Sequence, residues 1–181
     1  MSLLKNCWIV LLLLITLSAM SGCQSSARDP YAPVLVGPQL VQSEILGYSV
    51  ENRPIELITL GNGPDHVLIM STIHGNEDAG TPLVHRLIER LRVRPSILNG
   101  CTVYVIPVAN PDGYANRTRG NANGIDLNRN FPADNRVDNE INGLGGLTEP
   151  ESVILHDFVL TRQPSRIVTI HQPLDCLDYD G

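Results

Sequence analysis

The sequence predicts an α/β domain in which helices cover both faces of a mixed, mostly parallel sheet. Continuous apolar runs such as HVLIMSTI at 66–73 and CTVYVIPV at 101–108 are typical of strands buried on both faces. Segments with a helical pattern alternate with these strands, as they do in α/β proteins.

Each expected element has its own sequence signal. ENRP at 51–54 is a turn between two apolar segments and predicts a hairpin, and leucines recurring every four residues from Leu83 predict a helix. Thr148 and Glu151 fit a capping box at the start of another helix. The stretch 109–147 is polar and rich in Asn and Gly, with no expected element. The expected elements are a hairpin at 45–60, a strand at 66–73, a helix at 77–92, a strand at 101–108, a helix from 148 to about Gln163 and a strand at 166–170.

The N-terminal region predicts export. Residues 1–22 combine Lys5 with an apolar run and small residues, which is the pattern of a secretory signal peptide. Met20-Ser21-Gly22-Cys23 resembles a bacterial lipobox, and that resemblance implies lipidation of Cys23. A plain secreted protein and an N-terminal anchor helix are the alternatives. Residues 23–40 are expected to be a tether, which leaves 41–181 as the folded domain, expected at the bacterial cell envelope.

Charge and cysteine usage exclude some functions. The chain of 181 residues has a net charge of −6, and no basic patch stands out, so nucleic acid is not an expected partner. Cys101 and Cys176 fall at opposite ends of parallel strands about 20 Å long, too far apart for a disulfide, so both are expected to be free thiols. Nothing in the sequence indicates an oligomeric state.

Polar side chains follow the buried strands at the edge where α/β sheets bind ligands. His74 and Glu77 follow the strand at 66–73, Asn110-Pro111-Asp112-Gly113 follows the next, and His171 follows the last. Two histidines and a carboxylate form a known catalytic zinc set. A single His-x-x-Glu is more often an ion pair, so the prediction depends on convergence at one edge. The remaining histidines are expected to be surface or packing residues: His66, His85 and His156.

Four motifs occur in a characteristic order. HGNE at 74–77, NPDG at 110–113, GIDLNRNF at 124–131 and TIHQP at 169–173 together resemble the zinc carboxypeptidases of the M14 type. The segment NANGIDLNRNFPA at 121–133 is especially similar to the bacterial murein peptide amidases. The resemblance implies cleavage of a peptide bond next to a free carboxylate. A muropeptide substrate cut at its γ-D-glutamyl-diaminopimelate bond is one candidate.

The resemblance also implies the metal site. His74, Glu77 and His171 would hold one Zn²⁺, and Asp126 would accept a hydrogen bond from His74 and fix its tautomer. The NPDG motif is expected to form a tight structural turn.

The same resemblance implies the substrate contacts. Asn128 and Arg129 would hold the terminal carboxylate of the substrate, because a guanidinium fork suits a planar carboxylate. Arg119 would stabilise the oxyanion, and Arg117 is the alternative for that role.

The family's general base, a glutamate on a late strand, is not matched in this chain. Ten residues follow His171, and Asp175, Asp178 and Asp180 among them do not fit the pattern. The expectation is therefore an N-terminal part of a longer enzyme, inactive alone, with the last strands beyond Gly181. The expected partners are a peptide or muropeptide and, through Cys23, a membrane. The alternatives are an N-acyl amino acid deacylase of the aspartoacylase-like type and an inactive zinc-binding lipoprotein.

Overall fold

A computed structural model of the chain describes residues 41–172. The predicted signal peptide, the tether, Cys23 and Cys176 lie outside these residues. The elements are β1 (Val41–Tyr48), β2 (Pro54–Leu60), β3 (Asp65–Ser71), α1 (Gly80–Val93), the 3-10 helix η1 (Pro95–Leu98), β4 (Cys101–Ile106), α2 (Pro111–Asn116), the 3-10 helix η2 (Leu127–Arg129), α3 (Pro150–Arg162) and β5 (Arg166–Ile170).

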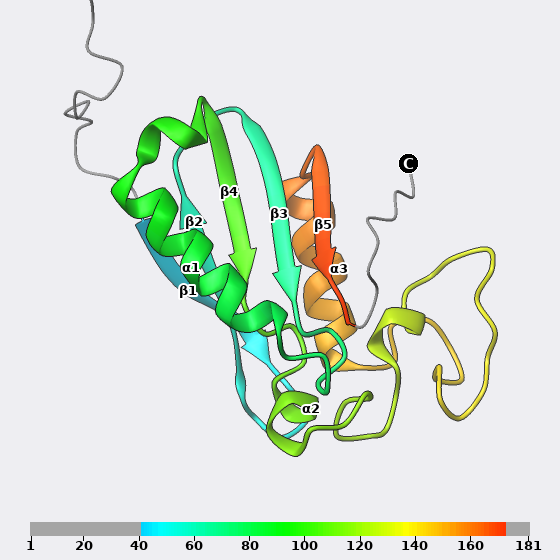
Figure 1. Cartoon of the computed structure of the whole chain (residues 1–181). Coiled ribbons are helices and arrows are strands. Elements are labelled where there is room, and N and C mark those ends of the chain that lie inside the picture. The colour runs from blue at the N-terminus through cyan, green and yellow to red at the C-terminus, as the bar shows by residue number, and fades with distance from the viewer. Residues whose placement is uncertain (1–40, 173–181) are drawn as a thin grey trace, which may run out of the picture. The chain divides into compact units, whose positions relative to one another are not determined.

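The described strands form one mixed sheet in the order β1-β2-β4-β3-β5 (Figure 1). The hairpin β1–β2 is antiparallel, and β2 also pairs antiparallel with β4. Strand β3 runs parallel to both of its neighbours, β4 and β5. The predicted mixed sheet is therefore confirmed, and the carboxyl ends of β3, β4 and β5 meet at one edge.

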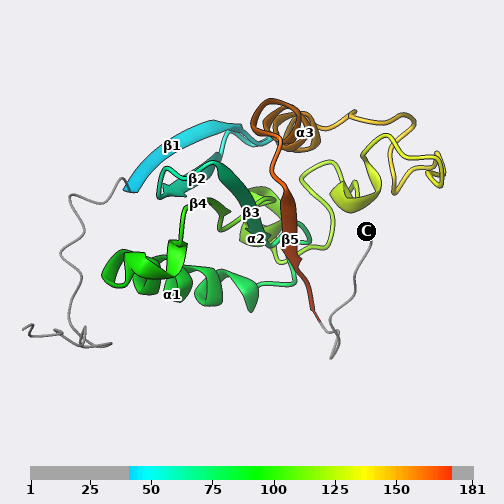
Figure 2. The ribbon, with the colours of Figure 1, turned by 90° about the horizontal axis from the view of Figure 1, so that it is seen from above.

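Helices cover both faces of the sheet, as predicted (Figure 2). Because successive residues of a strand point to opposite faces, β4 sends Val103 and Val105 toward α1 and Tyr104 and Ile106 toward α3. Each face thus has its own apolar core. No helix within residues 41–172 is both long enough and apolar enough to span a bilayer.

The strand and helix on either side of HGNE are shorter than predicted. Strand β3 ends at Ser71 because Thr72 adopts a left-handed backbone conformation with φ of 56°. Helix α1 begins at Gly80 rather than at Glu77. A Cβ on Gly80 would lie 2.2 Å from Ser71 Oγ and 2.9 Å from Ile170 Cγ2, so the helix start packs closely against β3 and β5. The loop between these elements carries the whole HGNE motif.

The predicted capping box at Thr148 is wrong. Helix α3 has Glu149 at its N-cap, with no side-chain capping hydrogen bond. Thr148 Oγ1 instead accepts a hydrogen bond from Asn130, and Glu151 accepts one from Asn121. The two side chains make long-range contacts that outcompete the local capping pattern.

The polar stretch 109–147 contains two short helices that the sequence did not predict, α2 and η2. NPDG is not an isolated turn but the start of α2: Asn110 is the N-cap and its side chain accepts a hydrogen bond from the Gly113 N–H. The predicted strand at 101–108 ends at Ile106, where the chain turns toward this helix.

Candidate metal and carboxylate-binding site

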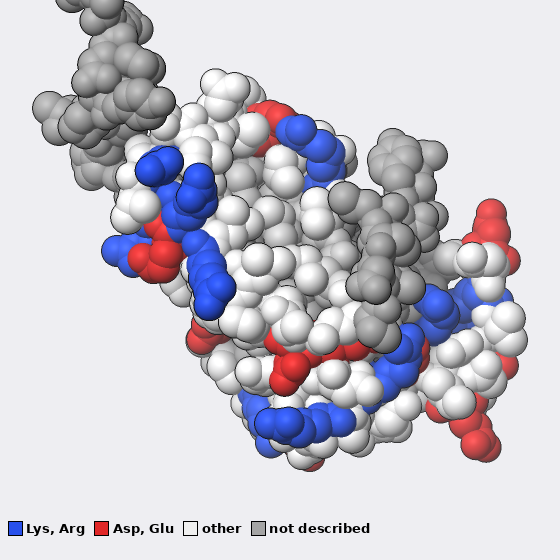
Figure 3. All heavy atoms as spheres, viewed as in Figure 1, with Lys and Arg blue, Asp and Glu red and all other residues white. Residues whose placement is uncertain are grey.

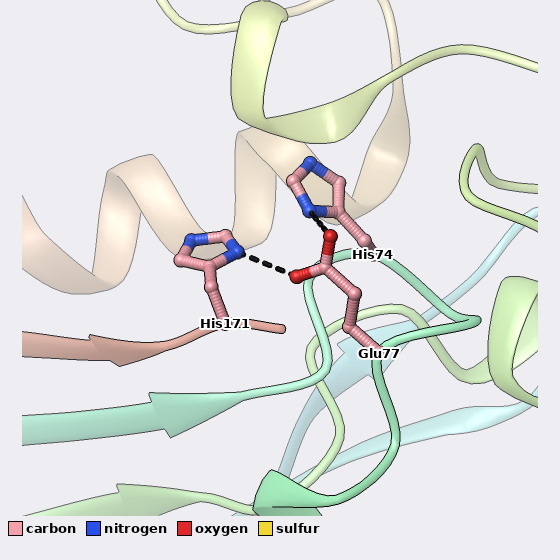
Figure 4. Close-up of side chains that lie close together, drawn as sticks. All are labelled: His74, Glu77 and His171. Atoms are coloured by element: carbon pink, nitrogen blue, oxygen red, sulfur yellow. Dashed lines mark hydrogen bonds and ion pairs between the residues drawn. The ribbon is translucent and has the colours of Figure 1, made fainter. Parts of the chain in front are cut away.

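The predicted metal ligands come together at the carboxyl edge of the sheet (Figure 4). His74 and Glu77 lie in the loop after β3, and His171 follows β5 directly. Since β3 and β5 are parallel neighbours, residues that follow them lie side by side. The left-handed turn at Thr72 redirects the chain out of β3 just before His74.

The Glu77 carboxylate lies between the two imidazole rings (Figure 4). Its Oε1 is 2.9 Å from His74 Nδ1 and its Oε2 is 2.9 Å from His171 Nδ1. One ligand atom from each of the three residues falls within 4.8 Å of the others. His74 and Glu77 are buried, whereas the side chain of His171 is 23% exposed, so the cluster opens toward solvent on one side.

Asp126 holds the other nitrogen of His74. Its Oδ1 lies 3.0 Å from His74 Nε2 and also accepts the backbone N–H of Asn128 at 3.0 Å. A carboxylate beside Nε2 favours the proton on that nitrogen, which leaves a lone pair on Nδ1. That lone pair then faces a carboxylate oxygen, and two acceptors this close repel one another unless a cation lies between them or the ring is protonated. The donor set therefore fits a bound zinc ion.

Both carboxylates of the cluster have pKa values below their usual range. Burial disfavours the charged form of Asp126, but hydrogen bonds from His74 and Arg119 outweigh it and lower its pKa to about 2. Burial likewise opposes ionisation of Glu77, yet hydrogen bonds from the backbone N–H of Gln172 and from His171 lower its pKa below the usual value. Both groups are ionised at neutral pH and present negative charge to a cation.

Arg119 lies inside the cluster and Arg117 does not. The Arg119 side chain donates from Nε to Asp126 Oδ2 and from Nη1 to Glu77 Oε1, each at 3.0 Å, and remains 50% exposed. Arg117 sits at the end of α2 with a φ of 55°, and its side chain makes no hydrogen bond within residues 41–172.

The predicted carboxylate-binding pair follows Asp126 in η2. Asn128 is partly buried, and Arg129 is exposed with its Nη1 donating to the Asn128 carbonyl at 3.1 Å. The three remaining histidines lie elsewhere: His66 packs edge-on against Tyr104, His85 is exposed on α1, and His156 lies beside Asp157. Cys101 is a free cysteine, and the prediction for Cys176 lies outside the described residues.

Sequence reasoning missed the support of the loop at 121–130. At one end, Asn121 Nδ2 donates to Glu149 Oε2 at 2.6 Å and to Glu151 Oε2 at 3.1 Å. At the other, Asn130 Nδ2 donates to Thr148 Oγ1 at 2.8 Å. Both ends of the loop that presents Asp126, Asn128 and Arg129 are therefore fixed to the start of α3. In the sequence, the only signal of this support was the pair of acids that follows Thr148, Glu149 and Glu151.

A second support lies under the HGNE loop. A Cβ on Gly75 would lie 1.9 Å from the carbonyl carbon of Gly113, so the HGNE and NPDG backbones pack in direct contact. The buried Asp112 accepts hydrogen bonds from Ser49 Oγ at 2.7 Å and from the Glu51 N–H at 2.9 Å. NPDG thus joins the β1–β2 turn to the metal-binding loop.

Gln172 ties the end of β5 to the same loop. Its backbone N–H donates to Glu77 Oε2 at 3.0 Å, and its side-chain Oε1 accepts from the Ala79 N–H at 2.8 Å. Its position directly after the third histidine was the sequence signal, but no role followed from it.

Comparison with known proteins finds a family match and relatives with the same fold. Residues 36–174 match the family described as zinc carboxypeptidase. Murein peptide amidase A of Escherichia coli K12 is 32% identical over 127 residues, which cover 61% of this chain and 50% of that protein. Carboxypeptidase E of Caenorhabditis elegans is 29% identical over 157 residues, which cover 72% of this chain and 33% of that protein.

A solved structure has a similar fold. The crystal structure of the murein-tripeptide amidase from Escherichia coli O157 matches with a TM-score of 0.60 and 28% identity, over 77% of this chain and 64% of that chain. The chain spans half or less of the length of the two curated relatives.

Proposed function

The chain belongs to the zinc carboxypeptidase family, and on that basis we propose that it carries the metal-binding and carboxylate-binding part of a peptide-hydrolysing active site. The observation that carries the proposal is the convergence of His74, Glu77 and His171, whose ligand atoms lie within 4.8 Å of one another. Zinc held by these residues supplies a Lewis acid that polarises the scissile carbonyl and activates water.

The surrounding residues have distinct proposed roles. Asp126 holds the proton of His74 on Nε2 and so keeps Nδ1 available as a ligand. Asn128 and Arg129 bind the free carboxylate of the substrate and so select the bond next to it. Arg119, half exposed and already beside Glu77, donates to the oxygen that becomes negative during hydrolysis.

The proposed substrate is a peptidoglycan-derived peptide. The amidase named above is a murein peptide amidase, and the segment at 121–133 resembles the bacterial murein peptide amidases. Export and lipidation at Cys23, also proposed, would place the site at the cell envelope. Labelling with a radioactive fatty acid tests the lipidation of Cys23, and the Cys23→Ala chain is expected to stay unlabelled.

We further propose that the 181-residue chain binds zinc and substrate without turnover. Hydrogen bonds lower the pKa of both carboxylates beside the site histidines, Glu77 and Asp126, below their usual values. Neither is suited to take a proton from water, because a general base works best with a pKa near the operating pH. Zinc-dependent release of diaminopimelate by this chain would contradict the lack of turnover and support the hydrolase directly.

Equilibrium binding tests the proposed substrate contact. The zinc-loaded chain is titrated with L-alanyl-γ-D-glutamyl-diaminopimelate, with the same tripeptide amidated at its free carboxylates, and with an N-acyl amino acid. The expected result is binding of the free tripeptide, lost on amidation and in Arg129→Gln. Equal binding of the amidated peptide would overturn the carboxylate role. Preference for the N-acyl amino acid would favour a deacylase.

A further inference from the structure

Helix α1 carries a basic face in an acidic protein. Four arginines fall between the middle of the helix and the residue after its end, and Glu89 is the only acid in residues 80–98. The four are Arg86, Arg90, Arg92 and Arg94, and all are exposed. Figure 3 shows their positive charge gathered over α1. The sequence prediction that no basic patch stands out is therefore wrong for this helix, whose four arginines lie within residues 86–94.

Most of this charge is not neutralised within the domain. Arg92 pairs with Glu89 at 2.9 Å, but Arg86, Arg90 and Arg94 form no ion pair within residues 41–172. A positive charge in the last turn stabilises the helix macrodipole, which accounts for Arg90 and Arg92. It does not account for Arg86, two turns from the end.

Apolar side chains stand among these arginines. Leu83 and Val93 on α1 are 56% and 74% exposed, and Ile97 in η1 is 47% exposed. Val84, Ile88 and Leu91 form the opposite, buried side of the helix. An outer face that mixes arginines with exposed aliphatic residues is the composition of a segment that rests on an anionic bilayer surface.

The chain upstream of the domain enters beside this face. Val41, the first residue of β1, lines a shallow groove together with Ile88, Glu89 and Arg92 of α1. Residues 23–40 can reach at most about 60 Å when fully extended. Any lipid anchor at Cys23 therefore holds the arginines within that distance of the membrane, at a high local concentration.

We propose that the α1 face, defined as Arg86, Arg90, Arg92, Arg94, Leu83 and Val93, docks on an anionic phospholipid bilayer. The arginines contact lipid phosphates, and the two aliphatic side chains enter the headgroup layer. The candidate metal site follows β3 and precedes the start of α1, about 20 Å from the end of this helix. Arg90, Arg92 and Arg94 therefore lie toward the end of α1 that is remote from this site.

Arginine footprinting on the full chain tests the proposal without altering the fold. The chain, purified from bacterial membranes, is reconstituted into vesicles of phosphatidylcholine alone or with added phosphatidylglycerol. It is then treated with phenylglyoxal and the modified peptides are quantified. We expect modification of Arg86, Arg90 and Arg94 to slow at least about fivefold on the anionic vesicles, and to recover at high salt. Arg117 on α2 and Arg162 on α3 are the internal controls, and their rates are expected to stay unchanged.

A variant provides the second arm. In the triple variant Arg86→Gln, Arg90→Gln, Arg94→Gln, the remaining Arg92 is expected to lose its protection, whereas Arg117→Gln is expected to keep it. Equal rates on both vesicles, or equal protection of Arg117 and Arg162, would overturn the proposal. Protection by soluble RNA with none on vesicles would overturn it as well. The candidate zinc site takes no part in this test. A negative result would therefore overturn membrane docking and leave the proposed binding of zinc and substrate standing.

Discussion

At the scale of single residues, the carboxylate of Asp126 connects three parts of the site. It accepts hydrogen bonds from His74, from Arg119 and from the backbone of Asn128. It therefore sets the tautomer of a candidate metal ligand, the position of the proposed oxyanion donor and the start of η2.

Substituting Asp126→Asn tests this role. The amide keeps the shape but removes the charge that holds the proton on His74 Nε2, so we expect zinc affinity to fall by about 10- to 100-fold. Competition with a chromogenic chelator measures the affinity. Asp78→Asn, an exposed acid next to Glu77, is the matched control and is expected to bind zinc normally. Unchanged affinity in Asp126→Asn would remove Asp126 from the metal site.

The pH dependence of stability reports on Asp112, whose side chain bonds to the β1–β2 turn and to none of the candidate metal ligands. Burial opposes its ionisation, but hydrogen bonds from Ser49, the Glu51 N–H and Arg53 lower its pKa below the ordinary value. A carboxylate of this kind stabilises the fold above its unfolded pKa of about 3.9. That contribution is lost as pH falls through the lower folded pKa.

We therefore expect Asp112→Asn to cost about 2 kcal/mol at neutral pH, through its lost hydrogen bonds. The difference in free energy of unfolding from the unsubstituted chain should shrink as pH falls below about 4. Urea unfolding of the metal-free chain at several pH values measures it. Asp134→Asn, which is exposed, should show little difference at any pH. A difference that stays constant with pH would exclude the charged hydrogen bonds as its cause.

At the scale of elements, the start of α3 acts as a clamp on the loop at 121–130. Asn121 is buried and is the shared amide donor for Glu149 and Glu151. Its own oxygen accepts the backbone N–H groups of Asn123 and Ile125. Removing this one side chain leaves several buried polar groups without a partner.

Asn121→Ala is expected to cost about 2 to 4 kcal/mol of unfolding free energy, because each buried group left unpaired costs about 1 to 3 kcal/mol. Hydrogen exchange at residues 126–129 should accelerate along with it. Asn116→Ala, exposed at the end of α2, is the control. If exchange at 126–129 stays slow in Asn121→Ala, the clamp is not what orders this loop.

The contact between the HGNE loop and α2 allows a test with one methyl group. A Cβ on Gly75 would collide with the Gly113 backbone at 1.9 Å, whereas a Cβ on Gly145 would meet only Thr148 Cγ2, at 3.7 Å. We expect Gly75→Ala to lose more than about 3 kcal/mol of stability or to fail to fold, and to bind zinc poorly. Gly145→Ala should behave like the unsubstituted chain. Thermal unfolding compares the two, and equal melting temperatures would contradict the close backbone approach.

Local patterns predicted the elements of the fold better than their ends. Apolar runs and helical periodicity were enough for the hairpin, the buried strands and both long helices. The end of β3 was not predictable in this way, because it depends on a left-handed Thr72, a β-branched residue that rarely adopts this conformation. The role of Thr148 was missed for a related reason: its partner Asn130 is distant in sequence.

At the scale of the whole molecule, the metal ligands could be predicted because a parallel sheet brings the residues after its strands to one edge. The order of the motifs indicated the resemblance to a family, and that resemblance implied the roles of Asp126 and Arg119. The supports at Asn121 and Gly75 could not be predicted, since each is a contact between segments that only the fold brings together. The basic face of α1 differs from these supports, because its four arginines lie within residues 86–94 and are visible in the sequence.

The central claim is that His74, Glu77 and His171 bind one zinc ion together, and zinc titration of the purified chain by calorimetry tests it most directly. We expect one ion per chain, and loss of tight binding in His74→Ala, Glu77→Ala and His171→Ala. His85→Ala and His156→Ala remove histidines that lie outside the cluster, so they should bind zinc like the unsubstituted chain. Tight binding that survives all three ligand substitutions, or that is lost equally in the two controls, would contradict the account.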